Sequence, residues 1–119
     1  FVPKPWSLVD CTIDLRAGGK FYTLMQSPEG EKFPNHGVYL EVVPQRKLVF
    51  TDAYVEAWTP SAKPFMTAIV TFEPQGSKTK YTAKAMHWTA EDRIAHEKMG
   101  FHDGWGKAAD QLSDLLKTL

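Results

Sequence analysis

The spacing between apolar residues changes near position 88, and this change constrains the fold more than any other feature of the chain. Across residues 8–16, the side chains of Val9, Cys11, Ile13 and Leu15 occupy every second position. Such alternation is typical of a strand that buries one face. Beyond residue 100, apolar residues recur at every third or fourth position, as on one face of a helix.

Five further segments have the composition of strands, rich in aromatic, β-branched or alternating apolar residues. They cover residues 20–26, 35–43, 48–55, 65–73 and 79–88. Glycine or proline marks the predicted turns at residues 17–19, 27–30, 44–47 and 74–78, whereas residues 56–64 form a longer predicted loop. Short strands joined by tight turns predict an antiparallel meander.

The C-terminal part of the chain is predicted to be helical. Thr89 has the side chain of a helix N-cap, and Arg93 and Glu97 are spaced for an ion pair one turn apart. Gly100 interrupts this first, short helix. The apolar stripe over residues 101–119 predicts a long amphipathic helix. About six strands followed by this helix predict an α+β fold, with an antiparallel sheet packed on a long C-terminal helix.

Composition and charge exclude several classes of protein. The 119 residues fit one domain, and 43% of them are apolar, as in a folded protein. With 14 basic and 14 acidic side chains the formal net charge is zero, so nucleic acid is not an expected partner. No apolar run is long enough to span a membrane and no leader is visible, so we expect no membrane partner. A single cysteine, Cys11, predicts a cytoplasmic location.

We expect neither a metal nor a cofactor. His96 and His102 are not at the two-histidine spacing of a helical zinc site, and no Cys-x-x-Cys pair accompanies them. Gly18 and Gly19 are not followed by the Gly-Lys-Ser/Thr of a phosphate loop. Cys11 lies on the apolar face of its strand, where it is predicted to be a buried, unreactive residue.

Four segments carry recognisable motifs. Residues 11–21 read C-T-I-D-L-R-A-G-G-K-F, and residues 37–44 read G-V-Y-L-E-V-V-P, followed by L-V-F-T at 48–51. T-F-E at 71–73 precedes Thr79, and Gly104-Trp105 precedes Leu112 and Leu116. Together, in this order, they resemble START-like domains of the activator of heat-shock-protein ATPase homologue type, in the SRPBCC superfamily. The resemblance implies a helix-grip fold, as in the birch-pollen allergen, with a cavity for a hydrophobic small molecule.

The resemblance also predicts that an N-terminal part is missing. Domains of this type begin with a strand and two short helices, followed by a loop rich in tryptophan and proline, which residues 1–6 resemble. We therefore expect a single START-like domain over residues 1–119 that lacks its N-terminal strand and first helices. An uncovered sheet edge favours pairing with a second chain, so a homodimer is one expected state.

Small residues on facing elements predict where a cavity would lie. Ala108 and Ala109 of the long helix face Ala83 and Ala85 of the last strand. Tight alanine packing without a cavity is the alternative, and the family resemblance favours the cavity. Its expected lining, apolar with a few polar groups, is Tyr39, Tyr54, Met66, Ala68, Ala85, His87, Trp105, Ala109 and Leu112.

Three functions fit these observations. The first is non-enzymatic binding of a hydrophobic small molecule. The second, implied by the polyketide cyclases and hydrolases among START-like relatives, is an enzyme in which His87, Tyr39 or Glu41 converge in the cavity. The third is a protein-interaction module with an exposed patch, as in a chaperone ATPase activator. We assign no catalytic residue, because no nucleophile or paired carboxylate can be placed beside His87, and a structural histidine is the simpler interpretation.

Overall fold

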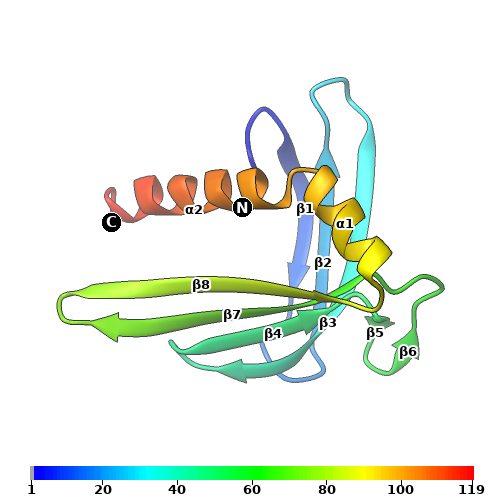
Figure 1. Ribbon diagram of the computed structural model, residues 1–119, viewed down its shortest axis with the longest axis horizontal. Helices are drawn as coiled ribbons and strands as arrows, with labels where there is room; N and C mark the ends of the chain where they lie inside the picture. The colour runs from blue at the N-terminus through cyan, green and yellow to red at the C-terminus, as the bar shows by residue number, and fades with distance from the viewer. Residues whose placement is uncertain (1) are drawn as a thin grey trace.

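A six-stranded antiparallel sheet is the main element of the computed structural model, which describes residues 2–119 (Figure 1). Its strands lie in the order β1-β2-β3-β4-β7-β8, and β5 and β6 form a small second sheet. The strands are β1 (Ser7–Ile13), β2 (Lys20–Gln26), β3 (Lys32–Val43), β4 (Lys47–Thr51), β5 (Tyr54–Glu56), β6 (Thr59–Pro60), β7 (Met66–Gln75) and β8 (Lys78–His87).

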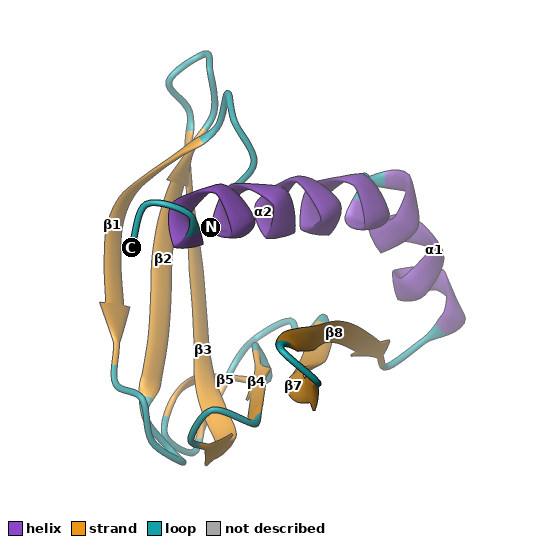
Figure 2. Cartoon of the chain, turned by 90° about the vertical axis from the view of Figure 1, so that its left-hand side faces the viewer, coloured by secondary structure: helices purple, strands orange, loops and turns teal. Residues whose placement is uncertain are grey.

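Two helices follow the last strand and cover one side of the sheet. α1 (Ala90–Lys98) continues from β8, and α2 (Phe101–Leu116) crosses over the hollow side of the bent sheet (Figure 2). Gly100 joins them with a φ of 90°, a left-handed conformation that lets the chain change direction between the helices. This arrangement confirms the predicted α+β, helix-grip fold.

The local signals predicted for the helices are confirmed. The hydroxyl oxygen of Thr89 accepts a hydrogen bond from the backbone amide of Asp92 at 3.1 Å, which caps α1. Arg93 and Glu97 form an ion pair one turn apart on α1. The long helix ends at Leu116 instead of reaching Leu119, since Lys117 occupies the C-cap position.

The strand predicted over residues 48–55 is interrupted, which corrects the sequence-based prediction. Oδ1 of Asp52 accepts hydrogen bonds from the backbone amides of Phe65 and Met66, at 2.8 and 3.0 Å. These bonds hold the end of β4 against the start of β7 and turn the chain away before β5. The predicted loop over residues 56–64 contains the short strand β6, which pairs with β5.

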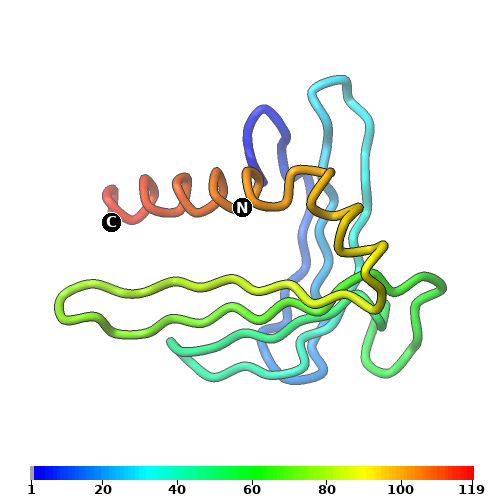
Figure 3. The backbone as a smooth tube through the Cα atoms, viewed as in Figure 1, coloured from blue at the N-terminus to red at the C-terminus, as the bar shows by residue number. Residues whose placement is uncertain are grey.

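Strands β7 and β8 pair along their whole length, from Met66 opposite His87 to Gln75 opposite Lys78. The hairpin turn is therefore two residues long, shorter than the predicted loop over residues 74–78. Gly76 occupies its first position with a φ of 64°, which is consistent with a type II′ turn. Figure 3 shows the distal half of this hairpin extending away from the rest of the sheet.

Strand β1 is an edge strand, and every one of its residues is exposed. The prediction that Cys11 is buried is therefore wrong, because its thiol-bearing side chain is exposed. The strand also ends at Ile13 instead of Arg16. Arg16 instead forms an ion pair with Asp14 at 2.8 Å and its carbonyl oxygen accepts a hydrogen bond from Gly19, which together build the turn.

The N-terminal segment is held against α2 by one side chain. Gln111 donates through Nε2 to the carbonyl oxygen of Val2 at 2.8 Å, and its Oε1 accepts from the backbone amide of Lys4 at 3.0 Å. Residues 2–6 have no strand or helix, as predicted, whereas Phe1 lies outside the described residues.

The core lies between the central strands and the beginning of α2. Its buried members are Tyr39, Phe50, Ala68 and Val70, and Trp105 of α2 packs against them. The core therefore links β3, β4 and β7 to the helix, and this contact fixes the distance at which α2 crosses the sheet.

Candidate functional site: a cavity between the sheet and the helices

A cavity of about 530 Å³ lies between the sheet and the helices. Apolar side chains dominate its lining, including Phe21 and Met25 of β2, Phe50 of β4, and Phe101 and Trp105 of α2. The volume falls within the range of roughly 300–1,000 Å³ that is common for small-molecule sites. The cavity is therefore large enough for a compact organic ligand.

Aromatic rings form the sheet side of this cavity. The ring of Phe21 stacks on Phe50 with centroids 5.0 Å apart, and its edge meets Tyr39 at 5.6 Å. Tyr39 is only 3% exposed, and burial, followed by the nearby Cys11 thiol, raises the pKa of its hydroxyl above the ordinary value. Tyr39 therefore stays uncharged at neutral pH, in the core behind Phe21 and Phe50.

Small residues on α2 leave room on the helix side. Gly104 and Ala108 both line the cavity, one helical turn apart. A methyl group added at Gly104 would meet Cγ of Pro3 at 3.8 Å, an ordinary contact, so the N-terminal segment lies directly beside the helix there. Val2 and Pro3 complete this side of the lining.

The remaining lining contains several polar side chains. Asp52 is half-buried, and its carboxylate is partly occupied by the amides of Phe65 and Met66. Within residues 2–119, Oγ of Ser61 is buried without a hydrogen-bond partner. Lys63 is exposed and also borders the cavity.

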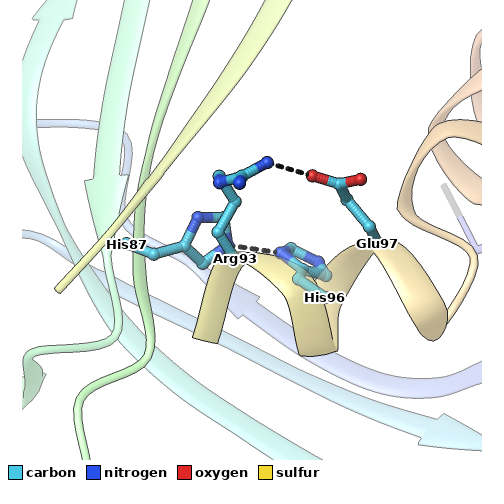
Figure 4. Close-up of polar contacts among 4 residues, drawn as sticks. All are labelled: His87, Arg93, His96 and Glu97. Atoms are coloured by element: carbon cyan, nitrogen blue, oxygen red, sulfur yellow. Dashed lines mark hydrogen bonds and ion pairs between the residues drawn. The ribbon is translucent and has the colours of Figure 1, made fainter. Parts of the chain in front are cut away.

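Two histidines meet at the junction of β8 and α1. Nε2 of His87 lies 2.8 Å from Nδ1 of His96, within hydrogen-bond distance (Figure 4). The ring of Phe65 packs edge-on against both histidines, and Phe101 packs against His96 with centroids 4.7 Å apart. His96 lines the cavity, whereas His87 lies behind it.

The surroundings of His96 favour its neutral form. Burial lowers the pKa of His96 below its ordinary value of 6.5, and the charge of a protonated His87 lowers it further. The Asp52 carboxylate opposes both effects, but is the smallest of the three. The pair therefore presents a neutral imidazole to the cavity at neutral pH.

A second, smaller cavity of about 210 Å³ lies between α2 and Tyr81 of β8. Ala108 borders both cavities, whereas Ala109 and Leu112 border only the smaller one. At this end α2 exposes apolar side chains, with Leu115, which also borders the smaller cavity, 56% and Leu116 58% exposed.

The structure separates the nine residues that the sequence predicts as cavity lining. Met66 and Trp105 line the larger cavity, and Ala109 and Leu112 line the smaller one. The other five border neither of the two. Tyr39 and Ala68 belong to the buried core, Ala85 pairs with Ala68 across β7 and β8, Tyr54 packs edge-on against Trp58, and His87 supports His96.

Sequence reasoning missed the polar residues of the larger cavity. The spacing of His96 and His102 speaks only to a metal site, whereas the partner of His96 in the structure is His87 of β8. The predicted strand over residues 48–55 runs through Asp52, although an aspartate at the end of an apolar run is a common turn signal. Ser61 and Phe65 gave no local signal, because their position depends on the bond between Asp52 and the start of β7.

Across residues 2–119, no three His, Cys, Asp or Glu side chains form a group that could hold a metal ion. In the same range, no helix has the length and apolar character needed to cross a bilayer.

Solved structures from three organisms are similar to this chain. Protein NE0264 from Nitrosomonas europaea is 53% identical with a TM-score of 0.95, and the match covers 99% of this chain and 76% of that one. Protein Ms6760 from Mycobacterium smegmatis is 27% identical with a TM-score of 0.74, covering 96% and 69%. Chr148 from Cytophaga hutchinsonii, 18% identical with a TM-score of 0.60 over 94% and 71%, shows the fold alone.

The comparison with protein families agrees with the motifs. No curated protein matches the chain. The family described as "Activator of Hsp90 ATPase homolog 1-like protein" matches residues 1–117. The chain therefore belongs to the family of activator of Hsp90 ATPase homolog 1-like proteins, and has its START-like, helix-grip fold.

Proposed function

We propose that this protein binds a hydrophobic small molecule in the larger cavity, without catalysing a reaction. The observation that carries the proposal is the cavity of about 530 Å³ between apolar side chains of the sheet and α2. A ligand that buries about 200 Å² of apolar surface there would gain roughly 5 kcal/mol from its removal from water. The half-buried polar residues of the lining, Asp52, Ser61 and His96, form a polar margin of the cavity and would orient the ligand.

The positions of the polar side chains fit non-catalytic binding better than they fit the active site of a polyketide cyclase or hydrolase. That alternative needs His87, Tyr39 or Glu41 to converge in the cavity. Tyr39 belongs to the core, and Glu41 is exposed and pairs with Lys47 at 3.2 Å. His87 contacts the cavity only through His96.

Native mass spectrometry of the purified protein tests the proposal. We expect a co-purifying small molecule, or binding of added ethylnaphthalene, in the wild type. Ala108→Phe should fill part of the larger cavity and weaken binding. Ala109→Phe, at a position that borders only the smaller cavity, is the matched control and should bind as the wild type does. Absence of any ligand, with no binding of ethylnaphthalene, would contradict the proposal.

A second candidate role is self-association, which is favoured by the exposed leucines of α2. Leu112, Leu115 and Leu116 leave an apolar face uncovered at the end of the helix, and exposed apolar patches often mark interaction surfaces. Sedimentation velocity should then detect a dimer that Leu115→Glu dissociates. Ser113→Glu adds the same charge to an exposed position of α2 and should leave the dimer intact. A wild-type monomer at all concentrations would exclude this role.

A further inference from the structure

We propose that the cavity recognises one neutral oxygen atom of its ligand, a hydroxyl or carbonyl group, through Nε2 of His96. This inference rests on the proposed binding function and names the class of ligand: an amphipathic, uncharged molecule with an oxygen at one end. The histidine borders the cavity, and its Nδ1 is engaged by His87 at 2.8 Å. Nε2 is therefore the ring atom that His96 can offer to a ligand.

The histidine pair can present either a donor or an acceptor to that ligand. In one arrangement Nε2 of His87 donates to His96, whose own Nε2 then carries a hydrogen and can donate to a carbonyl oxygen. In the other, Nδ1 of His96 donates to His87, and Nε2 of His96 becomes an acceptor for a hydroxyl group. The two neutral tautomers of the pair thus suit both neutral oxygen groups, a carbonyl and a hydroxyl.

The groups around His96 disfavour a charged ligand head. The rings of Phe65 and Phe101 pack against it, and an apolar environment penalises charge. The charged and titratable groups that face it are His87 from β8 and Asp52 from the end of β4. On its own helix, Arg93 and Glu97 neutralise each other in an exposed pair. The Asp52 carboxylate in particular would repel an anion.

Ser61 provides a second, independent indication of a hydrogen-bonding ligand. Its Oγ is buried without a partner within residues 2–119, and the residue lines the same cavity. A buried hydroxyl without a partner is costly, so native structures usually satisfy it. Its backbone amide donates to Ala53, next to Asp52, so Ser61 lies near the polar margin of the cavity. A ligand oxygen at this margin would satisfy it.

Lys63 supports the rival interpretation, in which an anionic head is bound. Lys63 is an exposed residue that borders the cavity. A carboxylate ligand held by Lys63 would not need His96. The two interpretations therefore predict opposite preferences among otherwise matched ligands.

Four probes that share one ring system separate these cases: ethylnaphthalene, acetylnaphthalene, naphthol and naphthoate, all substituted at the same ring position. Dissociation constants are measured by fluorescence titration of the full chain at neutral pH. We expect acetylnaphthalene and naphthol to bind about tenfold tighter than ethylnaphthalene, the effect of one hydrogen bond. Naphthoate should bind most weakly.

His96→Phe should remove the preference for oxygen and leave the binding of ethylnaphthalene within about twofold of wild type, because the aromatic ring is kept. His102→Phe is the matched control, since His102 is an exposed histidine of α2 that borders neither cavity. It should retain the preference.

Each of the remaining outcomes would overturn the inference about the oxygen atom. Tightest binding of naphthoate, lost in Lys63→Met, would overturn the inference in favour of an anionic ligand. Equal binding of all four probes, unchanged by His96→Phe, would overturn it while the proposed binding function stands. If no probe binds, the proposed function fails with it.

Discussion

Oδ1 of Asp52 lies 2.8 Å from the backbone nitrogen of Phe65 and accepts its hydrogen bond. The same oxygen accepts from the amide of Met66, so one carboxylate joins the end of β4 to the start of β7. This bond also sets the ring of Phe65 beside His87 and His96. The position of the polar margin of the cavity therefore depends on a side chain that is itself part of the lining.

Replacement of Asp52 should destabilise the fold according to which hydrogen bonds survive. Asp52→Ala removes both acceptor contacts, and we expect the free energy of unfolding to fall by about 2–3 kcal/mol. Asp52→Asn keeps an acceptor oxygen without the charge and should cost only about 1 kcal/mol. Urea unfolding measures both.

Asp10→Ala is the control for the loss of a carboxylate, because Asp10 is exposed on the edge strand β1. It should change the stability by less than about 0.5 kcal/mol. Equal costs for Asp52→Ala and Asp10→Ala would show that the two amide contacts contribute nothing.

The lowered pKa of His96 predicts a loss of stability in mild acid. The unfolded chain takes up a proton near the ordinary value of 6.5, whereas the folded chain resists it because of burial and the His87 charge. As pH falls below 6.5, protonation thus favours the unfolded state, until the lower folded pKa is passed.

His96→Phe removes this titration, so its stability should fall less than that of the wild type between neutral pH and mild acid. Thermal unfolding across this range gives the comparison, with His102→Phe, an exposed neighbour, as control. Parallel curves for wild type and His96→Phe would exclude the predicted effect.

Two glycines of the helical region should respond in opposite directions to alanine. Gly106 lies inside α2 with open space around it, so Gly106→Ala should stabilise the protein by about 1 kcal/mol through helix propensity. Gly100 has a φ of 90°, so Gly100→Ala should destabilise it by about 1 kcal/mol or more. Midpoints of urea unfolding provide the measurement, and a shift of both variants in one direction would contradict the assigned helix boundary.

Gln111 should control how tightly the N-terminal segment closes the cavity. Gln111→Ala loses the bonds to Val2 and Lys4, with an expected cost of about 1 kcal/mol. The amide hydrogen of Lys4 should then exchange with solvent faster, as followed by NMR. Lys107→Ala, an exposed change on the same helix, should leave this exchange rate unaltered, and an unchanged rate in Gln111→Ala would refute the contact.

Periodicity alone was sufficient to predict the main elements, because each depends on residues close in the chain. The stripe of α2, the Thr89 cap and the break at Gly100 are all local patterns. The interruption at Asp52 was missed because the carboxylate bonds to amides 13 and 14 residues away. The exposure of Cys11 was missed because alternation shows which residues share a face, but not whether that face is covered.

The candidate site was harder to predict for the same reason. The pairing of His87 with His96 depends on how α1 folds back over the end of β8, which no spacing in the sequence encodes. Met66, at the start of β7, and Trp105, in the first half of α2, both line the larger cavity. Tyr39 of β3 and Ala68 of β7 instead pack into the core, since neighbouring rings fill the space around them.

The outer end of the β7–β8 hairpin offers an attachment point for a spectroscopic label. Gln75 lies nine residues after Met66, which borders the cavity, so the far end of β7 is about 30 Å along the strand from the cavity. A dye attached to Ser77→Cys would report on bending of the hairpin without reaching the cavity. Because the thiol of Cys11 is also exposed, Cys11→Ser has to precede that labelling.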